Sequence, residues 1–215
     1  MSKKQIEIFA PIMAVLTALI IGGIIIQLNG VNPLAAYGQL FKSAFYQANP
    51  KAPFMSGLAK TLLTATPMIF AGLAVMMAFK AGLFNIGGQG QMIMGGLAAA
   101  VVGIYVKNVL FGNFVVAIIA AGIAGFLWAA IAGLLKAKFG VHEVISTIML
   151  NYIAINLQNY LLNYPIKDPA SQNVQTMKVW EPARLFLLAP ETKQKLNFGF
   201  ILAIIAVIIV WYFFK

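Results

Sequence analysis

The sequence predicts an all-α polytopic membrane protein, a transmembrane helical bundle with one broken membrane helix near residues 84–96. Three observations predict this fold. Of the 215 residues, 61% are hydrophobic and only 9% are charged, whereas a soluble domain carries about 25% charged residues. The apolar residues form runs long enough to cross a hydrocarbon core of about 30 Å. Within this apolar chain lies a cluster of glycines and amides, which a lipid-facing helix would not favour.

Six apolar runs are predicted to span the membrane as a single transmembrane domain. They cover residues 8–28, 58–79, 91–106, 114–135, 142–164 and 198–214. The first run is too long for a signal peptide and no small-residue cleavage site follows it, so it is expected to be a true span. Two long hydrophilic segments, 29–56 and 165–197, separate the spans. In the first segment, Pro33 is expected to begin a short helix along the membrane interface.

Three of the predicted spans carry a pattern with a structural meaning. Pro67 removes an amide donor from the second span and is expected to kink it. Small residues recur every four positions in the fourth span and predict close helix packing; they are Ala117, Ala121, Gly125, Ala129 and Gly133. The fifth span is unusually polar, with Thr147, Asn151 and Gln158 on one helical stripe. We expect this span to be surrounded by protein and water rather than lipid.

The positive charge of the chain indicates membrane topology. The net charge is +10, and the lysines lie at span ends and in loops, which is typical of anchoring rather than of a nucleic-acid partner. Lys80, Lys136 and Lys138 fall in short loops on one side, and Lys107 falls on the other. With the N-terminal lysines, this bias predicts a multi-pass protein of the cell membrane with a cytoplasmic N-terminus. The absence of cysteine excludes disulfides and thiol chemistry.

The stretch around which the chain is organised runs from Phe84 to Gly96. It contains five glycines, two glutamines and one asparagine. Non-helical backbone at membrane depth is tolerated only where it is buried in protein or lines a watery cavity, and interrupted spans often mark transport sites. We therefore interpret residues 84–91 as a break that faces a pathway. The alternative is that the glycines only let helices pack closely, which suits Gly95 better than Gln89.

No catalytic or cofactor-binding constellation is visible. His142 and Glu143 are interpreted as residues that begin a helix rather than as a metal or proton-relay site, because no second ligand accompanies the histidine. The glycine stretch lacks the Lys-Ser/Thr of a phosphate-binding loop, so any ATP must be hydrolysed by another chain. Charges are nearly absent inside the spans. This argues against an ion-driven carrier and favours a small, neutral, hydrogen-bonding solute.

Two stretches resemble the signatures of a known family. The run Ala81-Gly-Leu-Phe-Asn-Ile-Gly-Gly-Gln-Gly-Gln91, followed by Gly95, is similar to the motif aGlfNIGaeGQ…G of permease subunits of ATP-binding-cassette importers. The run Glu143-Val-Ile-Ser-Thr-Ile-Met-Leu-Asn-Tyr152 resembles the signature EvistlMLNYia of the nucleoside and simple-sugar branch. That branch lies within the wider family of branched-chain amino-acid and ribose permeases. Where that family commonly has a glutamate, Gln89 keeps the shape of the side chain and loses its charge.

The resemblance covers nearly the whole chain and implies its function and partners. It implies a translocation subunit that moves nucleosides or simple sugars inward by alternating access. The implied partners are a separate ATPase subunit, a second permease subunit and an extracytoplasmic solute-binding lipoprotein, which would dock on the outer segments 29–56 and 165–197. It also implies that the chain is the N-terminal part of a longer permease. The alternatives are a passive channel or facilitator for small neutral polar solutes, a non-transporting scaffold and, last, an enzyme.

The candidate site residues come from the two polar stretches. The expected substrate-pathway residues are Asn85, Gln89, Gln91, Thr147, Asn151 and Gln158, and the expected structural residues are Gly87, Gly88, Gly90, Gly95 and Pro67. Asn85 and Gln91 are expected to tie the broken backbone together by hydrogen bonds. In the alternative interpretation these amides only join helices, which is worth about 0.6 kcal/mol per hydrogen bond in one membrane protein.

Overall fold

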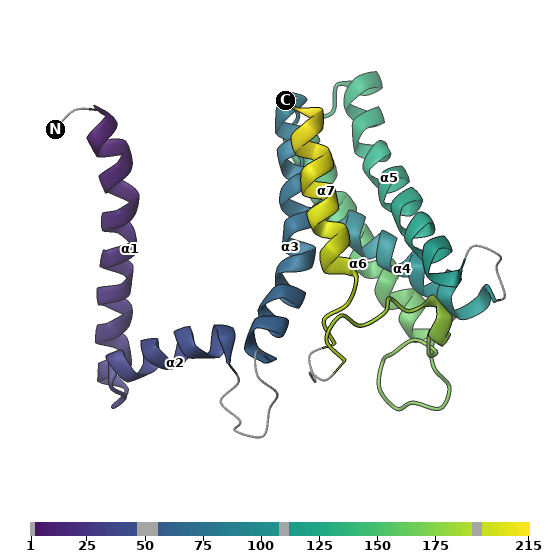
Figure 1. The fold of residues 1–215 in the computed structure, drawn as a ribbon. Coiled ribbons are helices and arrows are strands. Elements are labelled where there is room, and N and C mark those ends of the chain that lie inside the picture. Colours follow the sequence, from purple (N-terminus) through teal and green to yellow (C-terminus); the bar gives the residue numbers. More distant parts are fainter. Residues whose placement is uncertain (1–2, 47–55, 108–111, 191–194) are drawn as a thin grey trace. The chain divides into compact units, whose positions relative to one another are not determined.

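The structure, a computed structural model, describes residues 3–46, 56–107, 112–190 and 195–215, and confirms an all-α helical membrane bundle. Its helices are α1 (Lys3–Leu28), α2 (Pro33–Phe45), α3 (Ser56–Lys80), α4 (Gly88–Tyr105), α5 (Asn113–Phe139), α6 (Glu143–Asn163) and α7 (Gly199–Phe213), with a 3-10 turn η1 at Glu181–Ala183 (Figure 1). Within the described residues, three helical stretches are apolar and long enough to cross a membrane, Phe9–Leu28, Ser56–Lys80 and Asn113–Phe139. The six predicted spans stay predictions.

The chain forms two compact units. One comprises the residues up to Leu62 together with Ala189–Leu196, and the other comprises Leu63–Leu188 together with Asn197–Lys215. Parts of both predicted outer segments, residues 47–55 and 191–194, lie outside the described residues.

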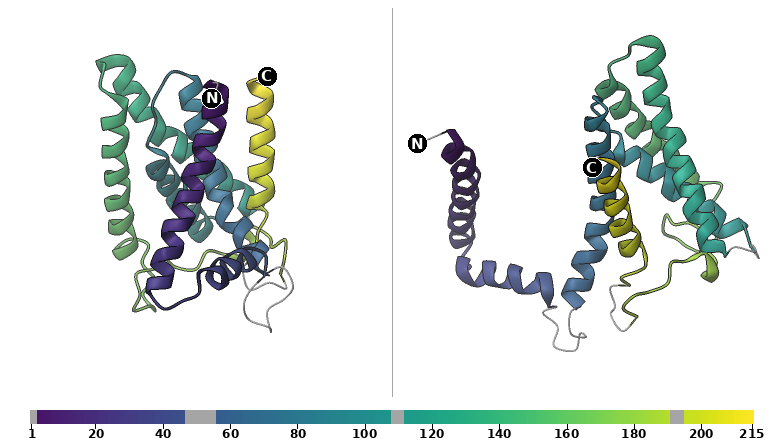
Figure 2. Two further views of the ribbon diagram at one scale, coloured as in Figure 1. Left: turned by 90° about the vertical axis from the view of Figure 1, so that its left-hand side faces the viewer. Right: turned by 45° about the horizontal axis from the view of Figure 1, so that its top comes forward.

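In the first unit, α1 and α2 meet in an L (Figure 2). The short helix predicted from Pro33 is confirmed as α2, with Pro33 in its first turn. Asn32 caps it, because its Oδ1 accepts hydrogen bonds from the backbone N–H groups of Leu34 (2.9 Å) and Ala35 (3.4 Å). This cap satisfies donors that the first turn of a helix leaves free.

In the second unit, α4 packs against both α5 and α6. Asn113, at the start of α5, is buried and donates Nδ2 to the carbonyl of Val106 (2.7 Å), which ties the end of α4 to α5. The segment after α6 also docks on α4, because the N–H of Trp180 donates to the carbonyl of Gly103 (2.9 Å). Val179 lies so close to Gly103 that a Cβ there would meet its Cγ1 at 2.6 Å.

The α4–α5 contact is made by small residues, as the four-residue stripe predicts. A Cβ on Gly95 would lie 3.0 Å from the carbonyl oxygen of Ala121, and a Cβ on Gly125 would lie 3.4 Å from that of Gln91. The two backbones therefore approach each other directly, which is how small residues strengthen helix packing in membranes.

We expect Gly95→Leu to destabilise the bundle and Gly96→Leu to be tolerated. A side chain at Gly95 would collide with the backbone of α5, whereas a Cβ at Gly96 meets nothing within 4 Å. Overpacking of this kind costs about 1–3 kcal/mol. Thermal unfolding of the two variants in detergent measures the difference, and equal midpoints would show that the α4–α5 approach is not tight.

An interruption between α3 and α4 is confirmed at residues 81–87, but the predicted break at residues 88–91 is wrong, because these residues are helical. α3 continues to Lys80 and α4 begins at Gly88, so Gly88–Gly96 is helical. Glycine lowers helix stability by only about 1 kcal/mol relative to alanine, and the close approach to α5 offsets that cost. Pro67 lies inside α3, where the expected kink stays a prediction.

Candidate functional site

The break between α3 and α4 begins with a glycine that ends α3. Gly82 has a φ of 73°, the left-handed conformation that favours glycine. The N–H of Leu83 donates to the carbonyl of Ala78 (2.9 Å), and the N–H of Gly82 donates to that of Phe79 (3.0 Å). This pair of bonds is a Schellman motif, which satisfies the last carbonyls of α3.

Asn85 holds the break in a compact turn. Its Oδ1 accepts hydrogen bonds from the N–H of Gly87 (2.7 Å) and from Nε2 of Gln91 (3.4 Å). The side chain thus replaces backbone partners that the interrupted helix lacks. The predicted tie between Asn85 and Gln91 is confirmed.

Asn151 on α6 forms hydrogen bonds both to the break and to the first turn of α4. Its Oδ1 accepts a hydrogen bond from the N–H of Gly90 (2.8 Å), and its Nδ2 donates to the carbonyl of Ile86 (3.0 Å). One carboxamide therefore satisfies a donor in the first turn of α4 and an acceptor in the extended segment before it. Because amides bear both functions, asparagine suits this role and leucine or alanine does not. We call this arrangement the Asn151 clasp.

The glycines of the motif make room for the Asn151 clasp. A Cβ on Gly90 would lie 2.9 Å from Oδ1 of Asn151 and 3.0 Å from Nε1 of Trp128. A Cβ on Gly87 would lie 2.9 Å from Oδ1 of Asn85 and 3.2 Å from Cβ of Thr147. Both glycines are buried. By contrast, a Cβ on Gly88 meets nothing within 4 Å.

The sequence interpretation missed Trp128. Its indole comes from α5 and packs on the backbone of Gly90, and its buried Nε1 has no hydrogen-bond partner in the described part of the chain. A tryptophan in the middle of a span is itself a signal, because this residue normally gathers at the membrane interfaces.

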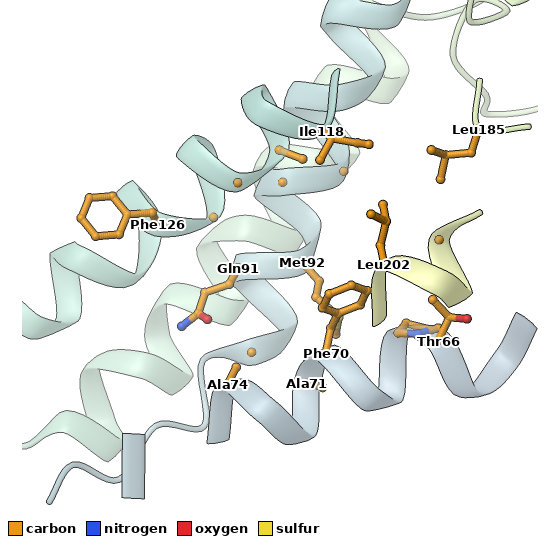
Figure 3. A pocket seen from close by; sticks show the side chains of 18 of the residues that line it. Thr66, Phe70, Ala71, Ala74, Gln91, Met92, Ile118, Phe126, Leu185 and Leu202 are labelled. Atoms are coloured by element: carbon orange, nitrogen blue, oxygen red, sulfur yellow. The ribbon is translucent and has the colours of Figure 1, made fainter. Parts of the chain in front are cut away.

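A cavity with a volume of about 800 Å³ lies beside the first turn of α4. Its wall comes from α3, α4, α5, the start of α7 and the residues Leu185 and Asn197, and Figure 3 labels Gln91, Phe70, Phe126 and Leu202 among the lining side chains. Most of the lining is apolar, and none of the lining residues is charged. Gln91 is the one pathway candidate in this wall.

The other pathway candidates do not converge on that cavity. Asn85 and Thr147 line a smaller cavity of about 180 Å³, and Gln158 lines another of about 360 Å³. Thr147 is 4% exposed, and its hydroxyl donates to the carbonyls of Glu143 (2.8 Å) and Val144 (3.2 Å). Gln89 is exposed and is not among the residues that line these three cavities. The pathway role of all six residues stays a prediction.

Lys136 and Glu143 form an ion pair near the break. Nζ of Lys136 lies 2.7 Å from Oε2 of Glu143, which is in the first turn of α6. Both residues line the small cavity that Asn85 and Thr147 share. A carboxylate is favoured at the positive end of a helix. Among the described residues, no group of three or more histidine, aspartate or glutamate side chains could hold a metal ion.

Comparison with known proteins gives a consistent set of relatives. The family described as "Branched-chain amino acid transport system / permease component" matches residues 57–215. The chain is 35% identical to the guanosine ABC transporter permease protein NupP of Bacillus subtilis, over 99% of this chain and 59% of that protein. It is 36% identical to the glucose ABC transporter permease protein TsgB13 of Haloferax volcanii, over 83% of this chain and 45% of that protein.

A third relative is the nucleoside ABC transporter permease protein NupB of Lactococcus lactis, 29% identical over 97% of this chain and 57% of that protein. The chain thus spans about half the length of these relatives. No solved structure matches it.

Proposed function

Given that the chain belongs to the permease family of branched-chain amino acid transport systems, we propose that it works as the translocation subunit of an ATP-binding-cassette importer for nucleosides or simple sugars. The relatives are permeases named for guanosine, glucose and nucleosides. These solutes are small, polar and rich in hydroxyl or amide groups, so their recognition calls for hydrogen bonds rather than for buried charge.

The observation that carries the proposal is the broken helix beside an uncharged cavity. Interrupted membrane helices with exposed backbone groups are a recurrent way to build a solute site. The cavity volume of about 800 Å³ falls in the range of small-molecule pockets, roughly 300–1,000 Å³. Its uncharged lining, in which Gln91, Asn197 and Thr66 lie among apolar side chains, is compatible with a neutral solute that has one polar edge and one apolar face.

Gln91 is the residue we place first on the pathway. Its Nε2 bonds to Asn85, so a solute that competes for the Gln91 amide would loosen the turn in the break. That exchange offers a physical link between solute binding and movement of α4 relative to α3 during alternating access. Gln89, Gln158, Thr147 and Asn151 complete the proposed set, with Asn151 acting through the backbone of the break.

The proposal extends to partners and orientation. ATP hydrolysis is assigned to a separate ATPase subunit, because the glycines of this chain are used in helix packing and in the Asn151 clasp rather than in a phosphate loop. A second permease subunit and an extracytoplasmic solute-binding lipoprotein complete the complex. We place the N-terminus, and the end that bears Lys136 and Glu143, on the cytoplasmic side of the cell membrane, as the lysine bias indicates.

Uptake in proteoliposomes tests the proposal. The full-length permease is purified with its ATPase and second permease, reconstituted, and supplied with the lipoprotein and radiolabelled guanosine or glucose outside. We expect accumulation of one of these solutes only when ATP and the lipoprotein are both present. Uptake down a gradient without ATP or the ATPase would instead establish the passive facilitator, and the importer proposal would be abandoned.

A further inference from the structure

α2 presents an apolar stripe to its surroundings. Leu34, Tyr37, Phe41 and Phe45 occupy positions i, i+3, i+7 and i+11 of this helix, and so they share one face. The exposed fraction is 82% for Leu34 and 74% for Phe41, and α2 has no buried residue. A run of exposed leucine and phenylalanine on a helix calls for an apolar partner.

We propose that α2 lies in the plane of the membrane surface, with this stripe in the acyl boundary of the bilayer, as a strut that joins α1 to α3. The partner is the lipid itself. This inference goes beyond the transport function and rests on the first unit of the structure alone.

The contact between Tyr37 and α1 fixes which way the stripe faces. The Tyr37 hydroxyl donates to the carbonyl of Leu19 (2.7 Å), and the ring lies over Gly22 and Gly23. Leu19 lies nine residues before the end of α1 at Leu28, which is about 13 Å along the helix axis. Tyr37 thus points back along α1 toward the middle of the apolar stretch Phe9–Leu28. The rest of the stripe faces the same side.

The polar residues of α2 lie on the side away from the stripe, with the exposed Leu40 at the edge of that side. Gln39 and Ser43 lie four residues apart on that side, Lys42 lies on its flank, and all three are exposed. A helix with one apolar face, one polar face and a flanking lysine is typical of helices that lie in a membrane interface. The stretch Phe9–Leu28 of α1 is long enough to span a bilayer, and many of its apolar side chains are exposed. The stripe lies on the side of α2 where Tyr37 contacts α1. The acyl chains of the bilayer can therefore cover both the apolar surface of α1 and the stripe on α2.

Both ends of α2 are fastened to a neighbouring helix. At its start, Cβ of Pro33 lies 3.6 Å from where a Cβ on Gly23 of α1 would be. Near its end, the Thr61 hydroxyl of α3 donates to the carbonyl of Ala44 (2.9 Å). Gly57 of α3 lies so close to this end that a Cβ there would meet the backbone N of Tyr46 at 2.5 Å.

The length of α2 sets the separation of the helices it joins. Its 13 residues extend about 20 Å. Directly packed helices lie about 8–10 Å apart. At this surface, α2 therefore holds the end of α1 away from the start of α3.

Site-directed spin labelling tests the proposal directly, because the chain has no cysteine. Leu34→Cys and Phe41→Cys place a label on the stripe, and Gln39→Cys and Ser43→Cys are matched controls on the polar face of the same helix. Each variant of the full chain is reconstituted in vesicles of phosphatidylethanolamine and phosphatidylglycerol. Collision of the label with oxygen, which dissolves in lipid, is compared with its collision with a water-soluble nickel chelate.

We expect the oxygen-to-nickel collision ratio at residues 34 and 41 to exceed that at residues 39 and 43 by about five-fold or more, as for a helix half-immersed in the interface. Tyr37→Phe, which removes the bond to Leu19, should reduce this contrast because that bond helps to fix the rotation of α2 about its axis. High nickel accessibility at all four positions would place α2 in water and overturn the proposal. Low accessibility to both reagents at residues 34 and 41 would show a protein partner on the stripe and would also overturn it. Solute uptake enters neither outcome, so failure here is separable from failure of the proposed function.

Discussion

Replacement of Asn151 by leucine is expected to abolish solute uptake while the chain still inserts into the membrane. The change removes the acceptor for the N–H of Gly90 and the donor to the carbonyl of Ile86. Each unpaired backbone group costs roughly 1–3 kcal/mol where water cannot replace the partner. These two hydrogen bonds join the break and the first turn of α4 to α6. Both segments lose this connection in the variant. Membrane insertion is expected to be preserved because leucine is more apolar than asparagine.

The matched control is Asn156→Leu on the same helix. Asn156 is exposed, and its Nδ2 donates only to the carbonyl of Tyr152 one turn earlier (2.8 Å). The same chemical change there leaves the break intact, so uptake by this variant should stay within about two-fold of the wild type, as for most surface substitutions. Uptake of the full complex in proteoliposomes and the amount of membrane-inserted protein are measured for both variants. Normal uptake by Asn151→Leu would show that the Asn151 clasp has no part in transport.

A single methyl group at Gly90 is expected to have a comparable effect. In Gly90→Ala, the new Cβ would lie 2.9 Å from Oδ1 of Asn151, 3.0 Å from Nε1 of Trp128 and 3.2 Å from Cα of Asn151. The last of these is a backbone atom of α6, so the helices must move apart. We expect uptake to fall by at least about ten-fold, which corresponds to a loss of about 1.4 kcal/mol or more in the functional arrangement.

Gly88→Ala is the matched control for this substitution. It lies two residues away in the first turn of the same helix, and its new Cβ meets nothing within 4 Å. Alanine is also the better helix former by about 1 kcal/mol, so this variant should be at least as stable as the wild type. Because Gly88 lines the cavity of about 800 Å³, the effect of Gly88→Ala on uptake is expected to be smaller than that of Gly90→Ala rather than zero. If Gly88→Ala and Gly90→Ala lose uptake to the same extent, the motif would act through backbone flexibility and not through the close approach of α6.

The break could be predicted because its signals are local. A lipid-facing helix disfavours glycines and amides, so their presence inside an apolar chain is visible in the sequence of residues 84–96 alone. The short-range tie between Asn85 and Gln91 follows from the same stretch. The extent of the break was harder to predict. The helical state of Gly88–Gly96 depends on contacts with Ala121, which no window of local sequence contains.

The Asn151 clasp shows what local sequence leaves out. The helical spacing of the fifth span grouped Thr147, Asn151 and Gln158 on one stripe. In the structure, Asn151 instead forms hydrogen bonds with the backbone of Gly90 and Ile86, 61 and 65 residues earlier. The Thr147 hydroxyl donates to the carbonyl of Glu143 in its own helix. Side-chain direction and long-range pairing decide such roles. The packing of Trp128 of α5 on Gly90 of α4, next to Asn151 of α6, likewise depends on three helices that are far apart in the sequence.

The function proposed here requires that the break between α3 and α4 and the first turn of α4 are in contact with water in a transport pathway. Single-cysteine labelling tests it most directly. Gln89→Cys and Gln91→Cys are made in the naturally cysteine-free chain, with Met68→Cys as a control on the exposed apolar surface of α3.

The complete importer in vesicles is then treated with a charged, water-soluble maleimide, with and without solute and ATP. We expect residues 89 and 91 to be labelled, the labelling rate at residue 91 to change with solute or ATP, and residue 68 to stay unlabelled in lipid. Absence of labelling at both 89 and 91 in every state would contradict the proposed function, and the amides would then serve only to hold the helices together.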